Sequence, residues 1–367
     1  MTSRLVFVTN DETHGGPNKV CERVSNLFST DSNCELIIQG KGELGFTNLS
    51  VKNFTRLSES NFKFFFEFIS KESKKFKNTT YIVFGTKQSL FLCLIKFLFR
   101  KKIKIIIRTG LNGNGSKHKK GNVFKDYFQL SVCKNLYRLA DMLVTETSSM
   151  RDWWIEQNVN SKNVVHINNP VKKLELKDKD LDFYKNLTKG YSKVIVSIGR
   201  LSYQKDHDLL VRAFSECVKL SGNKSYVLII LGEGNELDSL KKLCKELSIE
   251  NQVKFLGHVD NVRPFLELSD LYCLTSRWEG GVNSLIEAVY YGSKILAIDC
   301  PVGPADILSE TSDSVLVKSR SPKIFSEAMV QMLEQDLETS HALRNVDAYY
   351  DDNIKLKYKK IIEKVGS

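Results

Sequence analysis

Two carboxylates, Glu279 and Glu287, lie close together in the stretch from Ser276 to Ser293. The first is followed by Gly280-Gly281, and the second lies in an apolar run with the pattern of a helix. Backbone N–H groups in a loop that leads into a helix can hold an anion, because the free donors and the helix dipole point the same way. One carboxylate could then bind a sugar and the other a ribose, so the stretch indicates a nucleotide-sugar site.

A pair of cations, Arg200 and Lys205, follows the predicted strand 194–197. Two cations in the loop after a strand suit a diphosphate, because arginine offers a forked contact and lysine a point charge. The alternative is a pair of solvated surface charges. The nearby Glu279 loop favours the diphosphate.

The two carboxylates also raise the possibility of a retaining glycoside hydrolase, in which they would face each other across a glycosidic bond. Their spacing along a loop and a helix makes that arrangement awkward, because the second carboxylate points down the helix. Separate duties for Glu279 and Glu287 fit better, and a helix-surface charge is the remaining alternative for Glu287.

Weaker signals come from other glycines. Gly257 and His258 end the predicted strand 253–256 and could receive the edge of a base, although a lone histidine after glycine is usually a turn residue. Gly15-Gly16 follows the first predicted strand and would let the backbone approach a ligand. The sequence contains neither GxGxxG after the first strand nor GxxxxGK[ST], which argues against a dehydrogenase and a P-loop nucleotidase. It has no metal-binding motif, so we expect no metal and no cofactor.

The order of the predicted elements defines the fold class. Short apolar runs at residues 5–9, 35–39, 81–84, 103–107, 142–145 and 164–167 read as strands, as do 194–197, 226–231, 253–256, 271–275, 295–297 and 314–317. Helical patterns between them, such as 206–220, 236–247 and 321–335, predict an α/β protein with parallel sheets. The proline after Asn168-Asn169 marks a boundary between two similar domains. Ligands of such sheets bind beyond the carboxyl ends of the strands, so the motifs of both domains should meet in one cleft.

Charge is distributed unevenly along the 367 residues. The net charge is +11, and residues 1–170 carry 26 basic and 14 acidic side chains, so the excess belongs to the first half. A negatively charged partner should therefore meet that half, although a lysine-rich composition can also reflect genome bias. The apolar segments 61–69 and 90–99, the latter followed by Arg100-Lys101-Lys102, would either dip into an anionic membrane surface or form ordinary buried helices.

The composition argues against several classes of protein. No apolar run reaches the length of a membrane span, and no secretory signal is evident. The eight cysteines have no metal-ligand spacing and read as free buried thiols of a reducing compartment. A nucleic-acid-binding protein would need interleaved exposed aromatics or a known module, and neither is present.

Taken in order, these motifs resemble family 4 of the retaining glycosyltransferases, which have the GT-B fold. The resemblance rests on Gly199-Arg200-Leu201, Gln204-Lys205, Leu231-Gly232-Glu233-Gly234, Phe255-Leu256-Gly257, Ser276-Arg277-Trp278-Glu279-Gly280, Asn283, Leu285-Ile286-Glu287-Ala288, Gly292 and Asp299-Cys300-Pro301-Val302-Gly303-Pro304. The first half matches only through Gly15-Gly16 and the overall pattern.

The resemblance implies two Rossmann-like domains that face each other across a cleft. Residues 1–169 would bind the acceptor, a helix at about 345–367 would pack back on them, and residues 170–344 would bind the nucleotide sugar. Arg200, Lys205 and Glu279 would be catalytic. The donor would also meet residues that are mostly in the second domain, namely Gly16, His258, Gly280, Gly281, Val282, Asn283, Leu285 and Glu287. Acceptor contacts would come from Gly15, Arg108, Asn112 and His118.

The function implied is transfer of a hexosyl or N-acetylhexosaminyl unit from a nucleotide diphospho-sugar, UDP-linked, to a glycan acceptor. That acceptor would be lipid-linked, in cell-surface polysaccharide assembly, with the enzyme in the cytoplasm or peripheral on the inner face of the membrane. Two departures bear on this: Gly281 replaces a phenylalanine of many members, and no histidine follows Arg108 until His118. A sugar-nucleotide epimerase and a degenerate binding partner are the alternatives.

Overall fold

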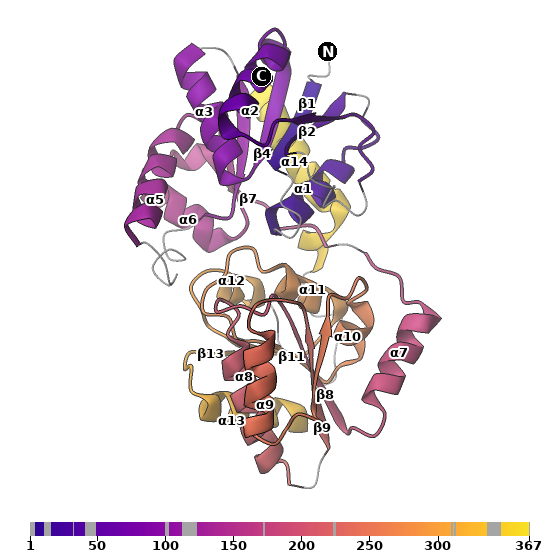
Figure 1. Cartoon of the computed structure of the whole chain (residues 1–367). Coiled ribbons are helices and arrows are strands. Elements are labelled where there is room, and N and C mark those ends of the chain that lie inside the picture. Colours follow the sequence, from indigo (N-terminus) through magenta and orange to yellow (C-terminus); the bar gives the residue numbers. More distant parts are fainter. Residues whose placement is uncertain are drawn as a thin grey trace. The chain divides into compact units, whose positions relative to one another are not determined.

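The computed structural model describes residues 4–10, 16–31, 33–40, 49–99, 103–111, 123–171, 173–222, 225–309, 311, 313–335 and 346–366. The chain divides into two compact units (Figure 1). Unit 1 comprises residues 1–170 together with 347–367, and unit 2 comprises residues 171–346.

Unit 1 contains a seven-stranded parallel sheet in the order β3-β2-β1-β4-β5-β6-β7. Its strands are β1 (Arg4–Asn10), β2 (Cys34–Gln39), β3 (Phe54–Leu57), β4 (Thr79–Phe84), β5 (Lys104–Thr109), β6 (Met142–Thr145) and β7 (Val164–His166). The central strands are runs of buried residues, as in Thr79–Phe84, because both faces of a parallel sheet are covered.

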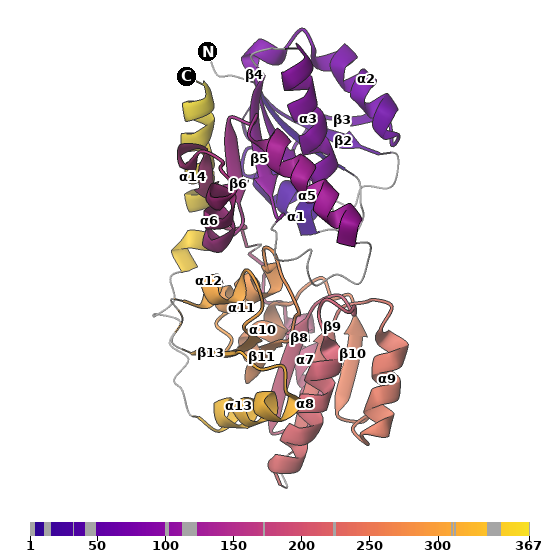
Figure 2. The same cartoon turned by 90° about the vertical axis from the view of Figure 1, so that its left-hand side faces the viewer.

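Helices cover both faces of this sheet. They are α1 (Gly16–Asn26), α2 (Asn61–Glu72), α3 (Thr86–Phe99), α5 (Val123–Tyr137), α6 (Ser148–Glu156) and α14 (Asp351–Gly366), with short 3-10 turns at Phe76–Asn78, Ser161–Asn163 and Val346–Tyr349. One core joins Val6 and Val8 to side chains of α2, α3 and α5. The opposite core joins Phe7 to α1 and α14, so the last helix is part of unit 1 (Figure 2).

Unit 2 contains a six-stranded parallel sheet in the order β10-β9-β8-β11-β12-β13. Its strands are β8 (Lys193–Ile198), β9 (Tyr226–Leu231), β10 (Val253–Gly257), β11 (Leu271–Leu274), β12 (Ile295–Ile298) and β13 (Ser314–Val317). The helices are α7 (Asp178–Thr188), α8 (His207–Leu220), α9 (Leu237–Glu246), α10 (Arg263–Leu268), α11 (Asn283–Tyr291), α12 (Pro304–Leu308) and α13 (Pro322–Glu334). Side chains of α8, α9 and α13 fill the core on one face, and α7 and α10 pack on the other.

The prediction of two parallel-sheet α/β domains is confirmed. In unit 2 the strand order reverses between β8 and β11, so consecutive connections leave this point in opposite directions. Such a switch point is where ligands of open α/β sheets bind. None of the described helices is long and apolar enough to cross a membrane. All eight cysteines are free and buried, as predicted.

Candidate functional site

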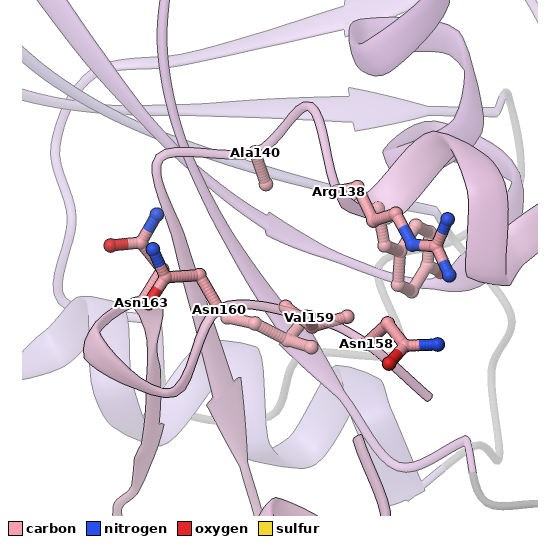
Figure 3. Close-up of a pocket in the computed structure, with 8 residues that line it drawn as sticks. Arg138, Ala140, Asn158, Val159, Asn160 and Asn163 are labelled. Atoms are coloured by element: carbon pink, nitrogen blue, oxygen red, sulfur yellow. The ribbon is translucent and has the colours of Figure 1, made fainter. Parts of the chain in front are cut away.

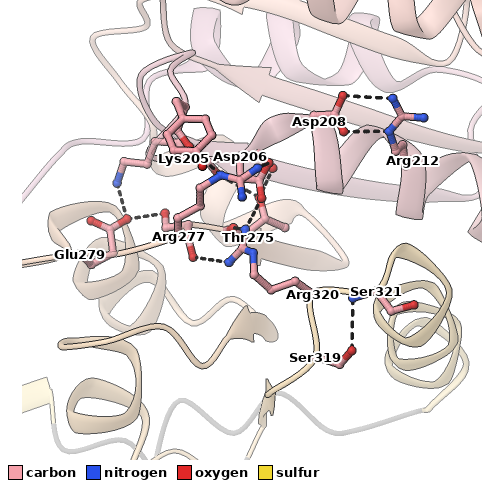
Figure 4. A network of polar contacts seen from close by, with 12 residues as sticks. Lys205, Asp206, Asp208, Arg212, Thr275, Arg277, Glu279, Ser319, Arg320 and Ser321 are labelled. Carbon is pink, nitrogen blue, oxygen red and sulfur yellow. Dashed lines mark hydrogen bonds and ion pairs between the residues drawn. The ribbon is translucent and has the colours of Figure 1, made fainter. Parts of the chain in front are cut away.

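Lys205 and Glu279 meet at the switch point of unit 2. Lys205 lies in the loop after β8 and Glu279 in the loop after β11, and the Lys205 Nζ donates to Glu279 Oε1 at 2.5 Å (Figure 4). Their side chains are only 15% and 5% exposed. A buried pair of this kind needs additional donors, and the Ser276 hydroxyl supplies one by donating to the same oxygen at 2.5 Å. The geometry therefore places an ammonium and a carboxylate together beyond two adjacent strands.

Three glycines let the loops at this edge pack closely. A Cβ at Gly232 would lie 2.0 Å from the carbonyl oxygen of Gly199, and a Cβ at Gly234 would lie 2.2 Å from that of Leu201. These gaps are far below van der Waals contact, so a larger residue at position 232 or 234 would push the β9 loop away from the β8 loop. The Lys205 stem in turn packs on Gly199, where a Cβ would lie 3.2 Å from Lys205 Cδ.

The Glu279 loop is held from its other side by the loop after β12. Gly303 has a φ of +109°, and a Cβ there would lie 2.7 Å from Val282 Cγ2 and 3.0 Å from the Gly280 carbonyl oxygen. The preceding Val302 also has a positive φ of 66°, which is strained for a β-branched residue. The Gly280-Gly281 turn is thus fixed between two loops before α11 begins at Asn283.

The predicted diphosphate pair is split by the structure. Lys205 is buried beside Glu279, whereas the Arg200 side chain is exposed, one residue beyond Gly199. Within the described part of the chain, the Arg200 guanidinium has no ion-pair partner. A flexible, exposed guanidinium at the carboxyl edge of β8 can reach an anion that arrives from solvent.

The helix α11 carries the remaining predicted donor contacts. Asn283 and Glu287 are half-buried and lie one turn apart on the same face, because residues four apart in a helix are neighbours. Leu285 is buried on another face and packs in the core instead. Burial raises the pKa of Tyr272 in β11, and the charges of Glu279 and Glu287 add to that rise.

His258 lies at the end of β10 and is exposed. Its backbone N–H donates to Glu233 Oε1 at 3.4 Å, and its Nε2 is 3.4 Å from the Asp260 carboxylate. Gly257 before it has a φ of +68°, and Gly232 pairs with Gly257 in an isolated bridge. The structure therefore brings the ends of β9 and β10 together and leaves the imidazole in solvent.

Three residues at this site had escaped sequence reasoning. Asp206, Arg277 and Arg320 form a cluster of ion pairs next to Lys205, in which the Asp206 side chain is buried and the two arginine side chains are 31% and 33% exposed (Figure 4). Asp206 follows Lys205 directly and Arg277 lies within the motif Ser276–Gly280, so their positions could have signalled them, but neither was assigned a role. Arg320 follows β13, outside every motif, and only the fold brings it here.

The predicted acceptor residues of unit 1 receive less support. Arg108 is buried at the end of β5, where it donates to the Tyr358 hydroxyl at 2.7 Å and to the Ile167 carbonyl oxygen at 3.1 Å. It also donates to the Asn169 side chain. These contacts favour a structural role that joins α14 to the sheet. Gly16 begins α1, and the predicted residues Gly15, Asn112 and His118 lie outside the described residues.

A small pocket in unit 1 is unrelated to these predictions (Figure 3). Its volume is about 230 Å³, below the usual range for ligand sites. Its polar lining includes Arg138, Asn158, Asn160 and Asn163. These residues precede β6 and β7, so the pocket lies at the amino ends of the strands. In the described part of the chain, no three His, Cys, Asp or Glu side chains are grouped as a metal ion would require.

Comparison with known proteins gives the family of unit 2. Residues 178–346 match the family described as "Glycosyl transferases group 1". An uncharacterized glycosyltransferase of Methanocaldococcus jannaschii, MJ1059, is 33% identical over 181 residues, which are 48% of this chain and 44% of that protein. The chain thus spans less than half the length of this relative.

Two further relatives are informative. The amylovoran biosynthesis glycosyltransferase AmsD of Erwinia amylovora is 24% identical over 92% of this chain and 91% of its own. A Campylobacter jejuni enzyme, N-acetylgalactosamine-N,N'-diacetylbacillosaminyl-diphospho-undecaprenol 4-alpha-N-acetylgalactosaminyltransferase, is 31% identical over 39% of this chain and 38% of its own.

A solved structure extends the similarity in fold to both units. Anabaena Alr3699/HepE in complex with UDP superposes with a TM-score of 0.80 at 14% identity, covering 98% of this chain and 100% of that one. At this identity the likeness concerns the fold alone. The chain therefore has the GT-B fold, and its residues 178–346 match the family of group 1 glycosyl transferases.

Proposed function

We propose that this protein is a retaining glycosyltransferase that moves a hexosyl or N-acetylhexosaminyl unit from a nucleotide diphospho-sugar to a glycan acceptor. The observation that carries the proposal is the buried Lys205–Glu279 pair at the switch point of unit 2. Donors of this kind combine a diphosphate, which suits an ammonium, with sugar hydroxyls, which suit a carboxylate. Both groups stand where ligands of parallel sheets bind.

In the proposed reaction the bond between the anomeric carbon and the diphosphate oxygen breaks. A bond to the acceptor oxygen forms on the same face of the ring, and the proton of the acceptor hydroxyl passes to the oxygen of the departing diphosphate. Charge accumulates on the leaving diphosphate, and Arg200 and Lys205 are the cations that stabilise it. Lys205 exchanges its contact with Glu279 for one with phosphate, which frees the carboxylate to accept from the sugar. Because side chains supply this charge, we propose that no metal takes part.

The other contacts follow from position. At the start of α11, Gly280, Gly281 and Val282 offer backbone contacts to the diphosphate and sugar, and Leu285 supports that turn from the core. Asn283 offers its side-chain amide, because its backbone N–H already donates to the Gly281 carbonyl oxygen at 2.9 Å. Glu287, one turn further on, binds the ribose hydroxyls, and the exposed backbone before His258 meets the base. We propose a UDP-linked donor, which the UDP in the Anabaena structure supports by analogy.

The biological setting proposed is cell-surface polysaccharide assembly, as for O-antigen or capsule, on a lipid-linked acceptor. Support comes from the names of two relatives, one of amylovoran biosynthesis and one that acts on a diphospho-undecaprenol glycan. We place the enzyme in the cytoplasm, peripheral to the membrane.

The surface proposed to meet an anionic membrane is the outer face of α2. Phe62 and Phe66 are 73% and 54% exposed, and their rings lie 4.8 Å apart. Exposed Lys63 and Lys71 lie on the same helix. An apolar pair flanked by lysines can insert its rings at the headgroup boundary while the ammonium groups meet anionic lipids.

A donor screen tests the reaction. Purified protein is mixed with UDP-, GDP- and ADP-sugars, and nucleotide release is measured with and without a lipid-linked glycan extract. Release from one donor that the extract stimulates, with a glycan product of unchanged anomeric configuration, is the expected result. Release without product would indicate hydrolysis or epimerisation. No release and no thermal shift with any nucleotide would favour the degenerate binding partner.

Flotation with anionic liposomes at low salt tests the membrane surface. The variant Phe62→Ser/Phe66→Ser should lose most of the binding, whereas Ile324→Ser, which alters an exposed apolar residue of unit 2, should bind like the parent. Equal binding by both variants would contradict the proposed surface, and so would a parent protein that does not float.

A further inference from the structure

The residue after Lys205 is held in an unusual way. Asp206 has a φ of +50°, the left-handed region that non-glycine residues rarely occupy, and it directly precedes α8 without a side-chain capping hydrogen bond. Its carboxylate is buried, and two guanidinium groups bind it. Arg277 Nη2 donates to Asp206 Oδ1 at 2.7 Å, and Arg320 Nη2 donates to Oδ2. A buried carboxylate in a strained backbone persists only where the surroundings hold it firmly.

Arg320 connects this carboxylate to the Glu279 loop. It follows β13 and donates to the carbonyl oxygens of Thr275 at 2.9 Å and Ser276 at 3.0 Å (Figure 4). Ser276 is the residue whose hydroxyl donates to Glu279. One guanidinium thus contacts the loops that carry the ammonium and the carboxylate of the proposed site.

Backbone contacts complete the connection. The Thr275 hydroxyl donates to the carbonyl oxygens of Lys205 and Asp206, both at 3.1 Å. The Arg277 N–H donates to the Gln204 carbonyl oxygen at 2.8 Å, and its guanidinium lies 4.3 Å from the Tyr203 ring. The loops after β8 and β11 are therefore joined along their length, and Arg320 ties both to the loop after β13.

We propose that Asp206 and Arg320 are positioning residues that set the separation between the Lys205 ammonium and the Glu279 carboxylate. Neither has to touch the substrate, since both guanidinium and carboxylate are directed into the loops. The expected effect on turnover rests on the proposed function. The effect of these residues on the separation of the two charged groups does not depend on that function. A displacement of about 1 Å at reacting groups can lower a rate about 100-fold, so this support matters for catalysis.

The first test compares Arg320→Met with Arg212→Met, which breaks the exposed Arg212–Asp208 pair on α8 (Figure 4). Arg320→Met should lower kcat about 10- to 100-fold while KM for the donor changes less than about threefold, because binding contacts stay in place. Arg212→Met should change neither. Asp206→Asn, which tolerates the left-handed backbone, should resemble Arg320→Met more mildly. Rates are measured well below each unfolding midpoint.

A double variant separates positioning from a general loss of stability. If Arg320 acts through Lys205, the variant Lys205→Met/Arg320→Met should have a kcat less than about threefold below that of Lys205→Met alone. Multiplied losses would overturn the proposal.

The second test needs no activity. The unfolding midpoints of Lys205→Met, Glu279→Gln and their double variant should be non-additive by about 3 °C or more, and Arg320→Met should remove most of that non-additivity. Persistence of the coupling in the Arg320→Met background would refute the positioning role. If no donor releases nucleotide in the donor screen but Arg320→Met does remove the non-additivity, the proposed function is refuted and the positioning role stands.

Discussion

Replacing Lys205 by methionine should affect turnover and stability for different reasons. The substitution keeps the stem that packs on Gly199 and removes only the charge. Without the ammonium, Glu279 remains buried with the Ser276 hydroxyl as one remaining donor. The leaving diphosphate would also lose a cation that we propose stabilises it.

The magnitudes follow from burial. Breaking a buried ion pair from one side costs about 3–5 kcal/mol, and the slight exposure of Lys205 and the Ser276 donor place this case at about 2–3 kcal/mol. For a unit of this size that lowers the unfolding midpoint by roughly 5–10 °C. Turnover should fall about 10²- to 10³-fold, as for the loss of one transition-state donor.

A matched control lies at the opposite end of β8. Lys193 pairs with Asp270 at 2.9 Å, but these side chains are 35% and 30% exposed, and the Val194 N–H also donates to Asp270. Lys193→Met should therefore cost about 0–1 kcal/mol and leave turnover unchanged.

The assay combines calorimetric unfolding with nucleotide release. Adding Glu279→Gln to Lys205→Met should restore part of the stability, because the unpaired charge is gone, but it should not restore turnover. Undiminished turnover in folded Lys205→Met would refute the catalytic assignment, and a midpoint equal to that of Lys193→Met would refute the burial argument.

Further predictions concern packing, pH and metals. Gly234→Ala should cost about 1–3 kcal/mol and weaken nucleotide binding, because its Cβ would meet the Leu201 carbonyl oxygen; calorimetric unfolding and titration with UDP check both. Burial, with a smaller contribution from the Lys205 charge, lowers the pKa of His207 to about 3. Below about pH 6.5 His207 is therefore protonated in the unfolded chain but stays neutral in the folded chain, so the free energy of unfolding should decrease as the pH falls. The decrease should be less steep in His207→Leu, and unfolding midpoints measured across this pH range check it. EDTA should leave nucleotide release unchanged, because Arg200 and Lys205 supply the charge; recovery that depends on added Mg²⁺ would contradict this.

Sequence patterns predicted the sheets well where strands are buried on both faces. Tyr226–Leu231 is apolar throughout and was predicted with its observed bounds, because a central parallel strand tolerates little else. The edge strand Phe54–Leu57 was missed, since its exposed Phe54 and half-buried Arg56 give no such run. The segment 61–69 allowed a buried or a membrane-facing helix, and α2 has one face with Phe64 and Phe68 buried and another with Phe62 exposed.

The site was predictable only where it is local in sequence. Lys205 and Glu279 stand out because glycines flank their loops, and glycines mark close backbone approach. Arg320 lies 114 positions from Asp206, and no spacing rule connects them; the order of β8, β11 and β13 in the sheet does. The resemblance placed Arg108 among the acceptor contacts, and no pattern in the sequence indicated that its guanidinium donates to the hydroxyl of Tyr358, 250 positions away.

The division of unit 1 into two stretches affects how the chain is made. Unit 2 is encoded between them, so α14, with its core residues Ile354, Tyr358 and Ile361, is synthesised after unit 2. At about 5–20 residues per second, unit 2 occupies the ribosome for roughly 10–35 s. During that interval unit 2 can fold, while one face of the sheet of unit 1 is not yet covered by α14. Phe28 is then uncovered, and Arg108 lacks its contact with Tyr358. The nascent chain is therefore most open to aggregation and to chaperones on this face, which is covered only after unit 2 has been made.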